Sequence, residues 1–446
     1  MPPLLPLVPY ADRAGRLAAV LDRRAVFDAD VEAAVRAVLD DVRERGDAAV
    51  LDFSERFDGV RPDPLRVPAA DLDRALDALD RDLRRTIEAA AANVRRFHEG
   101  EMPASWAHDD GDGVTYGQRV RPVDRAGLYV PAGTAPLPSS VVMNAVPAQV
   151  AGVGEVHLCS PPGPDGRPHP LILATARLLG IENVYAVGGA QAVAALAFGT
   201  ESVPRVDVVV GPGNAYVATA KKLVVGQVGI DSVAGPSEVV VLADADADPT
   251  FAAADLLAQA EHDERASAVL VTPSRALAEA VRAEVDRLVP TLPRAAVLRA
   301  SLPAYGAAVV TETMDEAVAC VDELAPEHLV ILAADADALW GRVRHAGAVF
   351  LGPYSPEPVG DYFAGPNHVL PTGGTARFAS ALGVGVFLRR QSVVRYSEAR
   401  LRQTGERIAR FAEAEGLDAH ALAVRLRLTS EEPRVKSEEP AAQGPQ

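Results

Sequence analysis

Short apolar segments typical of β-strands alternate with helix-length segments through the middle of the chain. The first series, between residues 127 and 211, reads GLYV, EVHLCS, NVYAVG and VDVVVG. A second series begins after Gly235 and reads SEVVVLA, SAVLVT, AAVVT, HLVIL and GAVFLG. Strands that alternate with helices form parallel sheets with helices packed on their faces, so the pattern predicts an α/β fold. We therefore expect two Rossmann-like parallel-sheet domains.

The length of 446 residues indicates more than one domain, because a single hydrophobic core stops growing at roughly 250 to 300 residues. The expected parts are N-terminal helices and a hairpin that pack on the α/β units (1–125), a first α/β domain (126–235), a second α/β domain (236–382), a helical C-terminal arm (383–429) and a disordered tail (430–446). The tail is rich in Glu, Pro and Gln, which cannot bury enough apolar surface to fold. The arm is too short to have its own core, so we expect it to pack on a partner.

Local signals place the N-terminal elements. Two helices are expected within residues 28–58, the first of which ends at Gly46. A single long helix is expected from Ala69 to about Glu99, where apolar residues recur at helical spacing. Between Gly113 and Pro131, short β-prone runs split by Pro and Gly predict a hairpin that leads into the first core strand.

Charge and cysteine content limit the classes of partner. Asp and Glu number 61 against 44 Lys and Arg, and the formal charge of −17 argues against binding to nucleic acid or an anionic membrane. Cys159 and Cys320 lie far apart without a CxxC motif, which fits a reducing, cytoplasmic setting. The first residues lack the basic region of a signal peptide, and no apolar run reaches the length of a membrane span.

The helix that follows the first strand of the second series carries a polar face. Asp248 is a good N-cap and Pro249 suits the first helical position. Asp255, Gln259 and His262 are spaced by four and three residues, so they share one face of the helix. Imidazole is a common metal ligand and Gln is not, so this face alone is more typical of a solvated helix end.

Two junctions between a strand and a helix contain glycines where a nucleotide would need them. They read Gly188-Gly189-Ala190-Gln191 and Gly211-Pro212-Gly213-Asn214. A helix N-terminus offers free N–H groups to a phosphate, although glycine also serves simply to make a turn tight. No GxGxxG motif follows a strand, so any nucleotide is bound differently from the usual Rossmann mode.

Further polar residues lie near the strands of the second series. Glu327 and His328 precede the strand LVIL, near a strand end where α/β proteins place ligands. On a regular strand they would point to opposite faces, and Pro326 favours the irregular junction that would let them converge. The alternative is a charged pair that caps the strand. Asp361, in the loop-like stretch PVGDYFAGPNH, is a candidate oxygen ligand.

The remaining histidines carry weaker signals. His420, five residues after Glu415 in the arm, would by itself be taken as a surface residue, and the role of His368 stays open. The other histidines are expected to be structural: His98, His108, His157, His169 and His345.

Together these segments resemble the histidinol dehydrogenase family from about residue 10 to residue 428. The resemblance is carried, in the order of the family, by the runs YVPAGTAPLPSSVVMNAVPAQVAGV, VGGAQAVAALAFGT, VGPGNAYVATAKKLV, GIDSVAGPSEV, DLLAQAEHD, APEHL and GDYFAGPNHVLPT. Ala132 and Leu137 depart from the usual PGG and Tyr-Pro of the family, which leaves the detail of the cofactor loop open.

The resemblance implies a role for each candidate residue. It implies the zinc ligands Gln259, His262, Asp361 and His420 and the catalytic bases Glu327 and His328. It implies the nicotinamide nucleotide contacts Tyr129, Gln191 and Asn214. It implies the substrate contacts Ser237, Gln259, His262, His328, Asp361, Glu415 and His420. Residues 126–235 would then be the nucleotide-binding domain and residues 236–382 the zinc and catalytic domain.

The reaction implied by the resemblance oxidises L-histidinol to L-histidine through an aldehyde, with two NAD as hydride acceptors. His328 suits the removal of the hydroxyl proton, and Glu327 suits the deprotonation of the water that hydrates the aldehyde. Zinc would hold substrate nitrogen and fix the reacting carbon. The resemblance also implies a homodimer in which the arm carries His420 into the partner's site.

Four other interpretations remain open at this stage. A thiol route like that of aldehyde dehydrogenases would need a cysteine nucleophile, for which Cys159 is the candidate. A related enzyme could oxidise another small amino alcohol or diol. A zinc hydrolase would use Glu327 to activate water without a nucleotide, and a binding protein would have little use for both Glu327 and His328.

Overall fold

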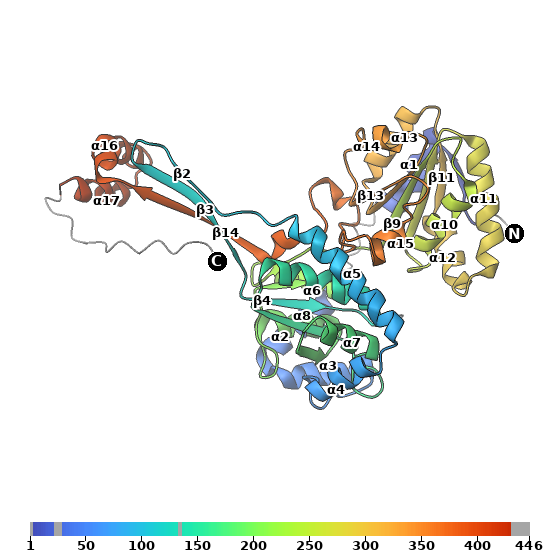
Figure 1. Cartoon of the computed structure of the whole chain (residues 1–446), viewed down its shortest axis with the longest axis horizontal. Coiled ribbons are helices and arrows are strands. Elements are labelled where there is room, and N and C mark those ends of the chain that lie inside the picture. The colour runs from blue at the N-terminus through green and yellow to red at the C-terminus, as the bar shows by residue number, and fades with distance from the viewer. Residues whose placement is uncertain (1–2, 22–28, 133–135, 430–446) are drawn as a thin grey trace. The chain divides into compact units, whose positions relative to one another are not determined.

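The structure is a computed structural model that describes residues 3–21, 29–132 and 136–429. The chain divides into two compact units (Figure 1). The first comprises Met1–Met102 and Pro122–Leu388, and the second comprises Pro103–Arg121 and Arg389–Gln446. The expected disordered tail lies outside the described residues.

The first sheet is fully parallel, with strand order β6-β5-β4-β7-β8. Its strands are β4 (Arg125–Tyr129), β5 (Glu155–Ser160), β6 (Asn183–Ala186), β7 (Val208–Val210) and β8 (Gly229–Ile230). Its crossover helices are α6 (Pro138–Ala151), α7 (Pro170–Leu178), α8 (Gly189–Phe198) and α9 (Ala215–Val224). Helices α6 and α7 pack in one hydrophobic core, and α8 and α9 pack in another. The chain order reverses between β4 and β7, where open α/β sheets bind ligands.

The second sheet is also parallel, with strand order β1-β11-β10-β9-β12-β13. Its strands are β1 (Leu7–Pro9), β9 (Glu238–Ala243), β10 (Ser267–Thr272), β11 (Ala307–Val310), β12 (His328–Leu332) and β13 (Ala348–Leu351). Three helices share one hydrophobic core: α10 (Pro249–Ala260), α11 (Arg275–Leu288) and α12 (Ala295–Tyr305). Three others share the second core: α1 (Arg13–Leu21), α13 (Met314–Leu324) and α14 (Ala336–Trp340). The predicted fold class is confirmed.

Helices from the N-terminal part cover the first sheet. They are α2 (Ala29–Arg45), α3 (Asp47–Asp58), α4 (Ala69–Asp77) and α5 (Arg81–Glu99). The single helix predicted over 69–99 is therefore wrong. Asp80 interrupts it as an N-cap whose carboxylate accepts hydrogen bonds from the N–H groups of Asp82 and Leu83.

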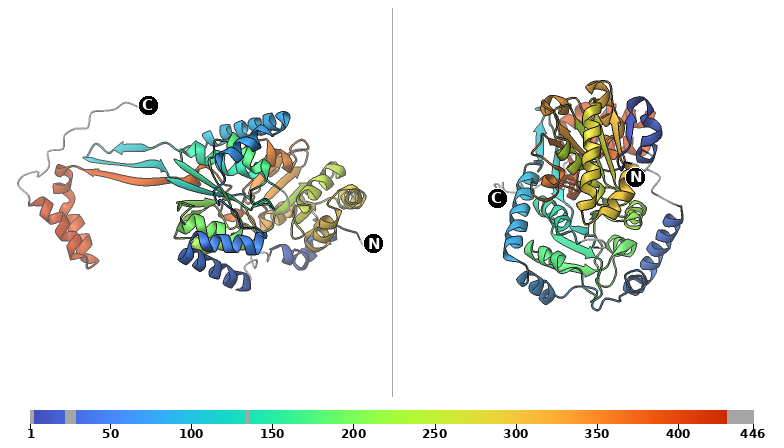
Figure 2. Two further views of the ribbon diagram at one scale, coloured as in Figure 1. Left: turned by 90° about the horizontal axis from the view of Figure 1, so that it is seen from below. Right: turned by 90° about the vertical axis from the view of Figure 1, so that its right-hand side faces the viewer.

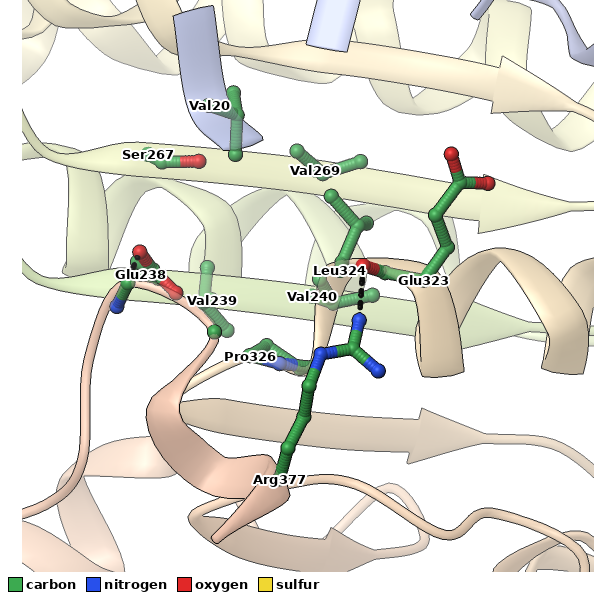
Figure 3. A pocket seen from close by; sticks show the side chains of 12 residues that line it. Val20, Glu238, Val239, Val240, Ser267, Val269, Glu323, Leu324, Pro326 and Arg377 are labelled. Carbon is green, nitrogen blue, oxygen red and sulfur yellow. Dashed lines mark hydrogen bonds between the residues drawn. The ribbon is translucent and has the colours of Figure 1, made fainter. Parts of the chain in front are cut away.

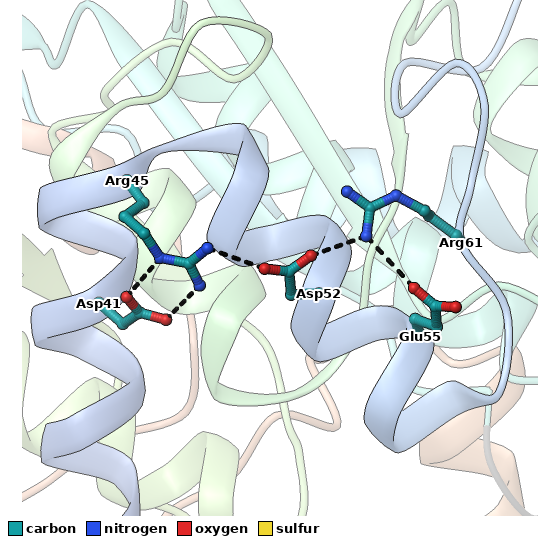
Figure 4. Close-up of polar contacts among 5 residues, drawn as sticks. All are labelled: Asp41, Arg45, Asp52, Glu55 and Arg61. Atoms are coloured by element: carbon teal, nitrogen blue, oxygen red, sulfur yellow. Dashed lines mark hydrogen bonds and ion pairs between the residues drawn. The ribbon is translucent and has the colours of Figure 1, made fainter.

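An ion-pair chain joins α2, α3 and the segment that follows α3 (Figure 4). Arg45 pairs with Asp41 and Asp52, and Arg61 pairs with Asp52 and Glu55. Because these side chains are open to solvent, the pairs contribute little to stability.

The second unit combines a small sheet with two helices (Figure 2). Strands β2 (Trp106–Asp109) and β3 (Val114–Pro122) form an antiparallel hairpin, and β14 (Leu388–Tyr396) lies on the other side of β3. Helices α16 (Glu398–Ala414) and α17 (Asp418–Leu428) pack on each other. Gly405 permits this packing, because a Cβ there would lie 2.8 Å from Leu428 Cδ1. Among the described residues, no helix has both the length and the apolar character needed to cross a bilayer.

Candidate active site

The polar face of α10 contributes the first residues of the candidate site. Asp248 caps the helix by accepting a hydrogen bond from the N–H of Thr250 at 2.7 Å, as predicted. The helix ends at Ala260, so His262 lies just beyond it and is exposed, whereas Gln259 is buried. The two residues thus stand at the end of α10 that leads into β10.

Three side chains offer metal-ligand atoms within 4.8 Å of one another: His262, Glu357 and Asp361. Glu357 and Asp361 are four residues apart on α15 (Glu357–Tyr362), so the loop predicted around Asp361 is wrong. Gly360 is required in this helix because a Cβ would lie 2.5 Å from the ring of Phe350. The sequence reasoning missed Glu357 because Pro358 and Gly360 hid the helical spacing from Glu357 to Asp361.

The two carboxyl groups on α15 are buried, and this determines their protonation. Burial raises the pKa of Asp361 to about 7. It raises the pKa of Glu357 well above its usual value, with Asp361 and Glu327 adding to the shift. A divalent cation beside these groups would favour their charged forms.

Glu327 and His328 converge on the backbone of Glu238, the first residue of β9. Glu327 Oε2 accepts a hydrogen bond from the N–H of Glu238 at 2.9 Å. His328 Nδ1 lies 3.2 Å from the carbonyl oxygen of Glu238. Ala325 makes the convergence possible with its left-handed backbone (φ 48°) just before Pro326.

Burial keeps His328 neutral. It lowers the pKa of the ring to about 3. The ring Nε2 lies 3.8 Å from Asp361 Oδ1 and has no hydrogen-bond partner among the described residues. His328 therefore places a ring nitrogen without a hydrogen-bond partner beside the carboxyl groups of α15.

Gln259 ties the pieces of the site together. With its amide nitrogen turned toward β9, that nitrogen lies 2.9 Å from His328 Nδ1, 3.1 Å from Glu357 Oε1 and 3.2 Å from the carbonyl oxygen of Glu238. His368, left open by the sequence, also belongs here, because its Nδ1 lies 4.0 Å from Asp361 Oδ1. Burial lowers the pKa of His368 to about 4.

The site lies at the amino ends of its strands. Glu238 begins β9 and Ser237 directly precedes it, His328 begins β12, and His262 precedes β10. Open α/β sheets generally bind ligands at the carboxyl ends of their parallel strands, and this rule predicted a site near Glu327 and His328. In the second sheet, these groups lie at the amino ends of the strands instead.

A small cavity lies on the other side of Glu238 (Figure 3). The Glu238 carboxylate lines it and accepts a hydrogen bond from the N–H of Gly373 at 3.0 Å. Arg377 closes part of it by donating to the carbonyl oxygen of Glu323 at 2.7 Å. With a volume of about 50 Å³, the cavity has no room for a metabolite.

The predicted nucleotide contacts lie at the carboxyl edge of the first sheet. Tyr129 ends β4, and its hydroxyl accepts a hydrogen bond from the N–H of Gly189 at 3.2 Å. Gln191 is buried, and both atoms of its amide lack a partner among the described residues. Asn214 caps α9 through the N–H groups of Tyr216 and Val217. An unpartnered buried amide is costly, so it marks a place where a ligand or water supplies the missing bonds.

The other two predicted site residues belong to the second unit. Glu415 follows α16, His420 lies in the first turn of α17, and both are exposed. The metal-ligand atoms that the first unit brings together are therefore those of His262, Glu357 and Asp361.

Both cysteines are fully buried, and their thiols are not activated as nucleophiles. Burial raises the pKa of Cys320 to about 12 and holds that of Cys159 far above its usual value. The thiolate is the nucleophilic form, so neither side chain is activated.

We therefore expect Cys159→Ala and Cys320→Ala each to retain turnover within about twofold, because neither thiol ionises near neutral pH. Steady-state rates of the two variants, with circular dichroism as a control for folding, test this. A folded but inactive Cys159→Ala protein would restore the thiol route.

Fold and site together define an α/β protein with two parallel sheets, a buried histidine and carboxylate centre on one and a pair of glycine turns on the other. The family model described as histidinol dehydrogenase matches residues 21–428, and the chain belongs to that family. The family predicted from the sequence motifs is thus confirmed.

Individual relatives agree with this assignment. Histidinol dehydrogenase of Geobacillus kaustophilus is 55% identical over 408 residues, which cover 91% of this chain and 96% of the relative. The protein of the same name from Bacillus subtilis is 51% identical over 393 residues, covering 88% and 92%. The crystal structure of histidinol dehydrogenase from Elizabethkingia anophelis aligns with a TM-score of 0.86 at 35% identity, covering 90% of this chain and 93% of that one.

Proposed function

We propose that this protein oxidises L-histidinol to L-histidine through L-histidinaldehyde, with zinc as a bound metal and two NAD as successive hydride acceptors. The observation that carries the proposal is the convergence of Glu327 and His328 on Glu238, beside His262 and Asp361, in a member of this family. The alternative is a related NAD- and zinc-dependent dehydrogenase of another small amino alcohol or diol.

The residues present fit a zinc ion. One imidazole and two carboxylates offer ligand atoms within 4.8 Å of one another, and nitrogen and oxygen donors of this kind bind zinc. We propose Gln259, His262, Asp361 and His420 as the ligands. Glu357 then orients Gln259 by accepting a hydrogen bond from its amide nitrogen, which reserves the amide oxygen for the metal. When bound, zinc supplies a positive charge that orients and polarises the substrate.

His328 is the proposed base for the hydroxyl proton in each oxidation. The proposed acceptor is Nε2, which has no hydrogen-bond partner among the described residues and lies 3.8 Å from Asp361 Oδ1. Burial keeps the ring neutral at neutral pH.

Glu327 is the proposed base for the water that hydrates the aldehyde. An aldehyde has no hydroxyl proton to lose, so the second oxidation must begin with the addition of water. Glu327 is buried next to His328, with its Oε2 3.7 Å from His328 Nδ1. Ser237 and the arm residue Glu415 are the proposed further contacts of the substrate.

The carboxyl edge of the first sheet is the proposed nucleotide site. Tyr129, Gln191 and Asn214 would contact the nicotinamide nucleotide, which accepts hydride when bound. The free amide of Gln191 supports this assignment. Ala132 packs against the hydrophobic core and Leu137 precedes α6, so the two departures from the usual family pattern lie at the start of the helix beside this edge.

We also propose a cytoplasmic homodimer with shared active sites. The two cysteines are buried and unpaired, as is usual in a reducing compartment. In the second unit, α16 and α17 expose Phe411 (71%), Leu422 (54%) and Leu426 (60%), which suits an arm that packs on another chain.

The stoichiometry of the reaction tests the proposed function. Incubated with limiting histidinol and excess NAD, the zinc-loaded protein is expected to form two NADH per histidinol, because each carbon oxidation releases one hydride. Absorbance at the NADH band measures the yield. One NADH per histidinol, or faster turnover of another amino alcohol, would favour the alternative enzyme, and consumption of substrate without NADH would favour a hydrolase.

The matched control uses the same protein after chelation. Activity is expected to fall to background and to return with zinc, because the proposed ligands come from separate segments and the metal is proposed to orient the substrate. Full activity of metal-free protein would contradict the proposed role of zinc.

A further inference from the structure

A buried ion pair lies at the carboxyl edge of the first sheet, joining Lys221 of α9 to Asp231, which follows β8. Each side chain is only 2% exposed. Lys221 is one of three lysines in a chain that otherwise uses arginine, the others being Lys222 and Lys436. A lysine ammonium is a compact charge that can donate in several directions, which suits a confined position.

Both partners of this ion pair hold the same residue, Gly211. Lys221 Nζ donates to the carbonyl oxygen of Gly211 at 2.9 Å. Asp231 Oδ2 accepts a hydrogen bond from the N–H of Gly211 at 2.8 Å. The N–H and the carbonyl group of Gly211 are therefore each held by one member of the ion pair.

Gly211 is where the chain turns from β7 toward the helix capped by Asn214. Its φ of 115° is a conformation that other residues rarely adopt, and a Cβ would lie 2.1 Å from the carbonyl oxygen of Tyr129. The turn therefore packs directly on the end of β4. Through the hydroxyl of Tyr129 it is also connected to Gly189 in the other glycine turn.

Unpartnered polar atoms lie around the same turn. The side-chain nitrogen of Asn144 is 3.2 Å from the position of a Cβ on Gly211, and its oxygen has no partner among the described residues. The amide of Gln191, below Gly189, is buried and equally unpartnered. Buried groups of this kind are normally satisfied, so they indicate a polar ligand at this edge.

We propose that Lys221 and Asp231 are positioning residues that hold the 211–214 turn in the shape that binds the nicotinamide nucleotide. The proposal rests on the proposed function. A buried ion pair contributes little stability compared with apolar side chains of similar size. The pair instead fixes the orientation of the Gly211 peptide groups. It thereby fixes the position of Asn214 relative to Tyr129.

The test measures KM for NAD and for histidinol separately in three variants and a control. Asp231→Asn keeps an acceptor for the N–H of Gly211 but removes the charge, and Lys221→Met removes the other partner. A single variant can fail to fold because it leaves one buried charge without its partner. The double variant Lys221→Met/Asp231→Leu removes both charges and avoids this cost. The control is Lys222→Met, whose side chain is exposed and pairs with Glu32.

The expected result is a rise of about tenfold in KM for NAD and in the dissociation constant of NADH, measured by its fluorescence, with KM for histidinol within about twofold. Lys222→Met should match the wild type. A folded variant that binds NADH like the wild type overturns the proposal. So does loss of folding in all three variants, because the pair would then act on stability. A wild-type protein that neither reduces NAD nor binds NADH would instead refute the proposed function.

Discussion

Replacing Glu327 by Gln is expected to slow oxidation of the aldehyde by about 10² to 10⁴-fold while slowing oxidation of histidinol to the aldehyde by less than tenfold. The amide of Gln keeps an oxygen that can accept the hydrogen bond from the N–H of Glu238, so the fold of the site should survive. What is lost is the base that acts on water, which only the second oxidation needs. Separate assays starting from histidinol and from the aldehyde measure the two halves.

His328→Asn serves as the comparison for this division of labour. His328 is proposed to accept a proton in both oxidations, so its loss should depress both halves to a similar extent. Equal losses in the two halves for Glu327→Gln would refute the separate role of Glu327.

Mixing two inactive variants is expected to restore activity if the arm reaches the partner's site. In a mixed dimer of His262→Ala and His420→Ala, one site collects both defects and the other has none. Random exchange of equal amounts should therefore restore roughly a quarter of the wild-type sites, a consequence of two-fold symmetry. Each variant alone should remain at background. Turnover before and after exchange measures the effect.

Subunit exchange must be shown independently, for example with a tagged variant recovered together with an untagged one. A mixture that exchanges subunits and stays inactive would place His420 in the site of its own chain, or outside the site. As a control, His108→Ala is mixed with His420→Ala in the same way, because His108 belongs to the hairpin and has no proposed role. This mixture shows how activity changes when only one of the two chains carries a defect in the site.

Local signals in the sequence were sufficient for much of the fold. Asp248 and Pro249 predicted the start of α10, and the apolar runs predicted the strands of both sheets except β1 and β8. Signals failed where two local preferences competed. Helical periodicity ran across residues 69–99, but the capping carboxylate of Asp80 divides the segment. Pro358 and Gly360 suggested a loop, but Pro is tolerated in a first helical turn and the Phe350 ring occupies the place of a side chain at Gly360.

The candidate site was predictable only in part, because much of it depends on contacts between distant segments. The contacts of Glu327 and His328 with Glu238 join residues about 90 positions apart, and no local sequence pattern predicts them. Helical spacing and local composition singled out Gln259, His262 and Asp361 as candidates, and the family resemblance gave them the role of metal ligands. Glu357 was missed because Pro358 and Gly360 masked the helix that it shares with Asp361.

The pairing of β1 with β11 bears on the order in which the protein forms during its synthesis. Leu7 lies opposite Ala308, so the ribosome must add about 300 residues after the first strand before the partner strand exists. At about 5 to 20 residues per second, that interval lasts roughly 15 to 60 s. The first sheet, whose strands lie between Arg125 and Ile230, can assemble while β1 waits. The earliest strand to leave the ribosome is thus among the last to find its place, and the growing chain must keep its apolar N-terminal segment from pairing elsewhere throughout that time.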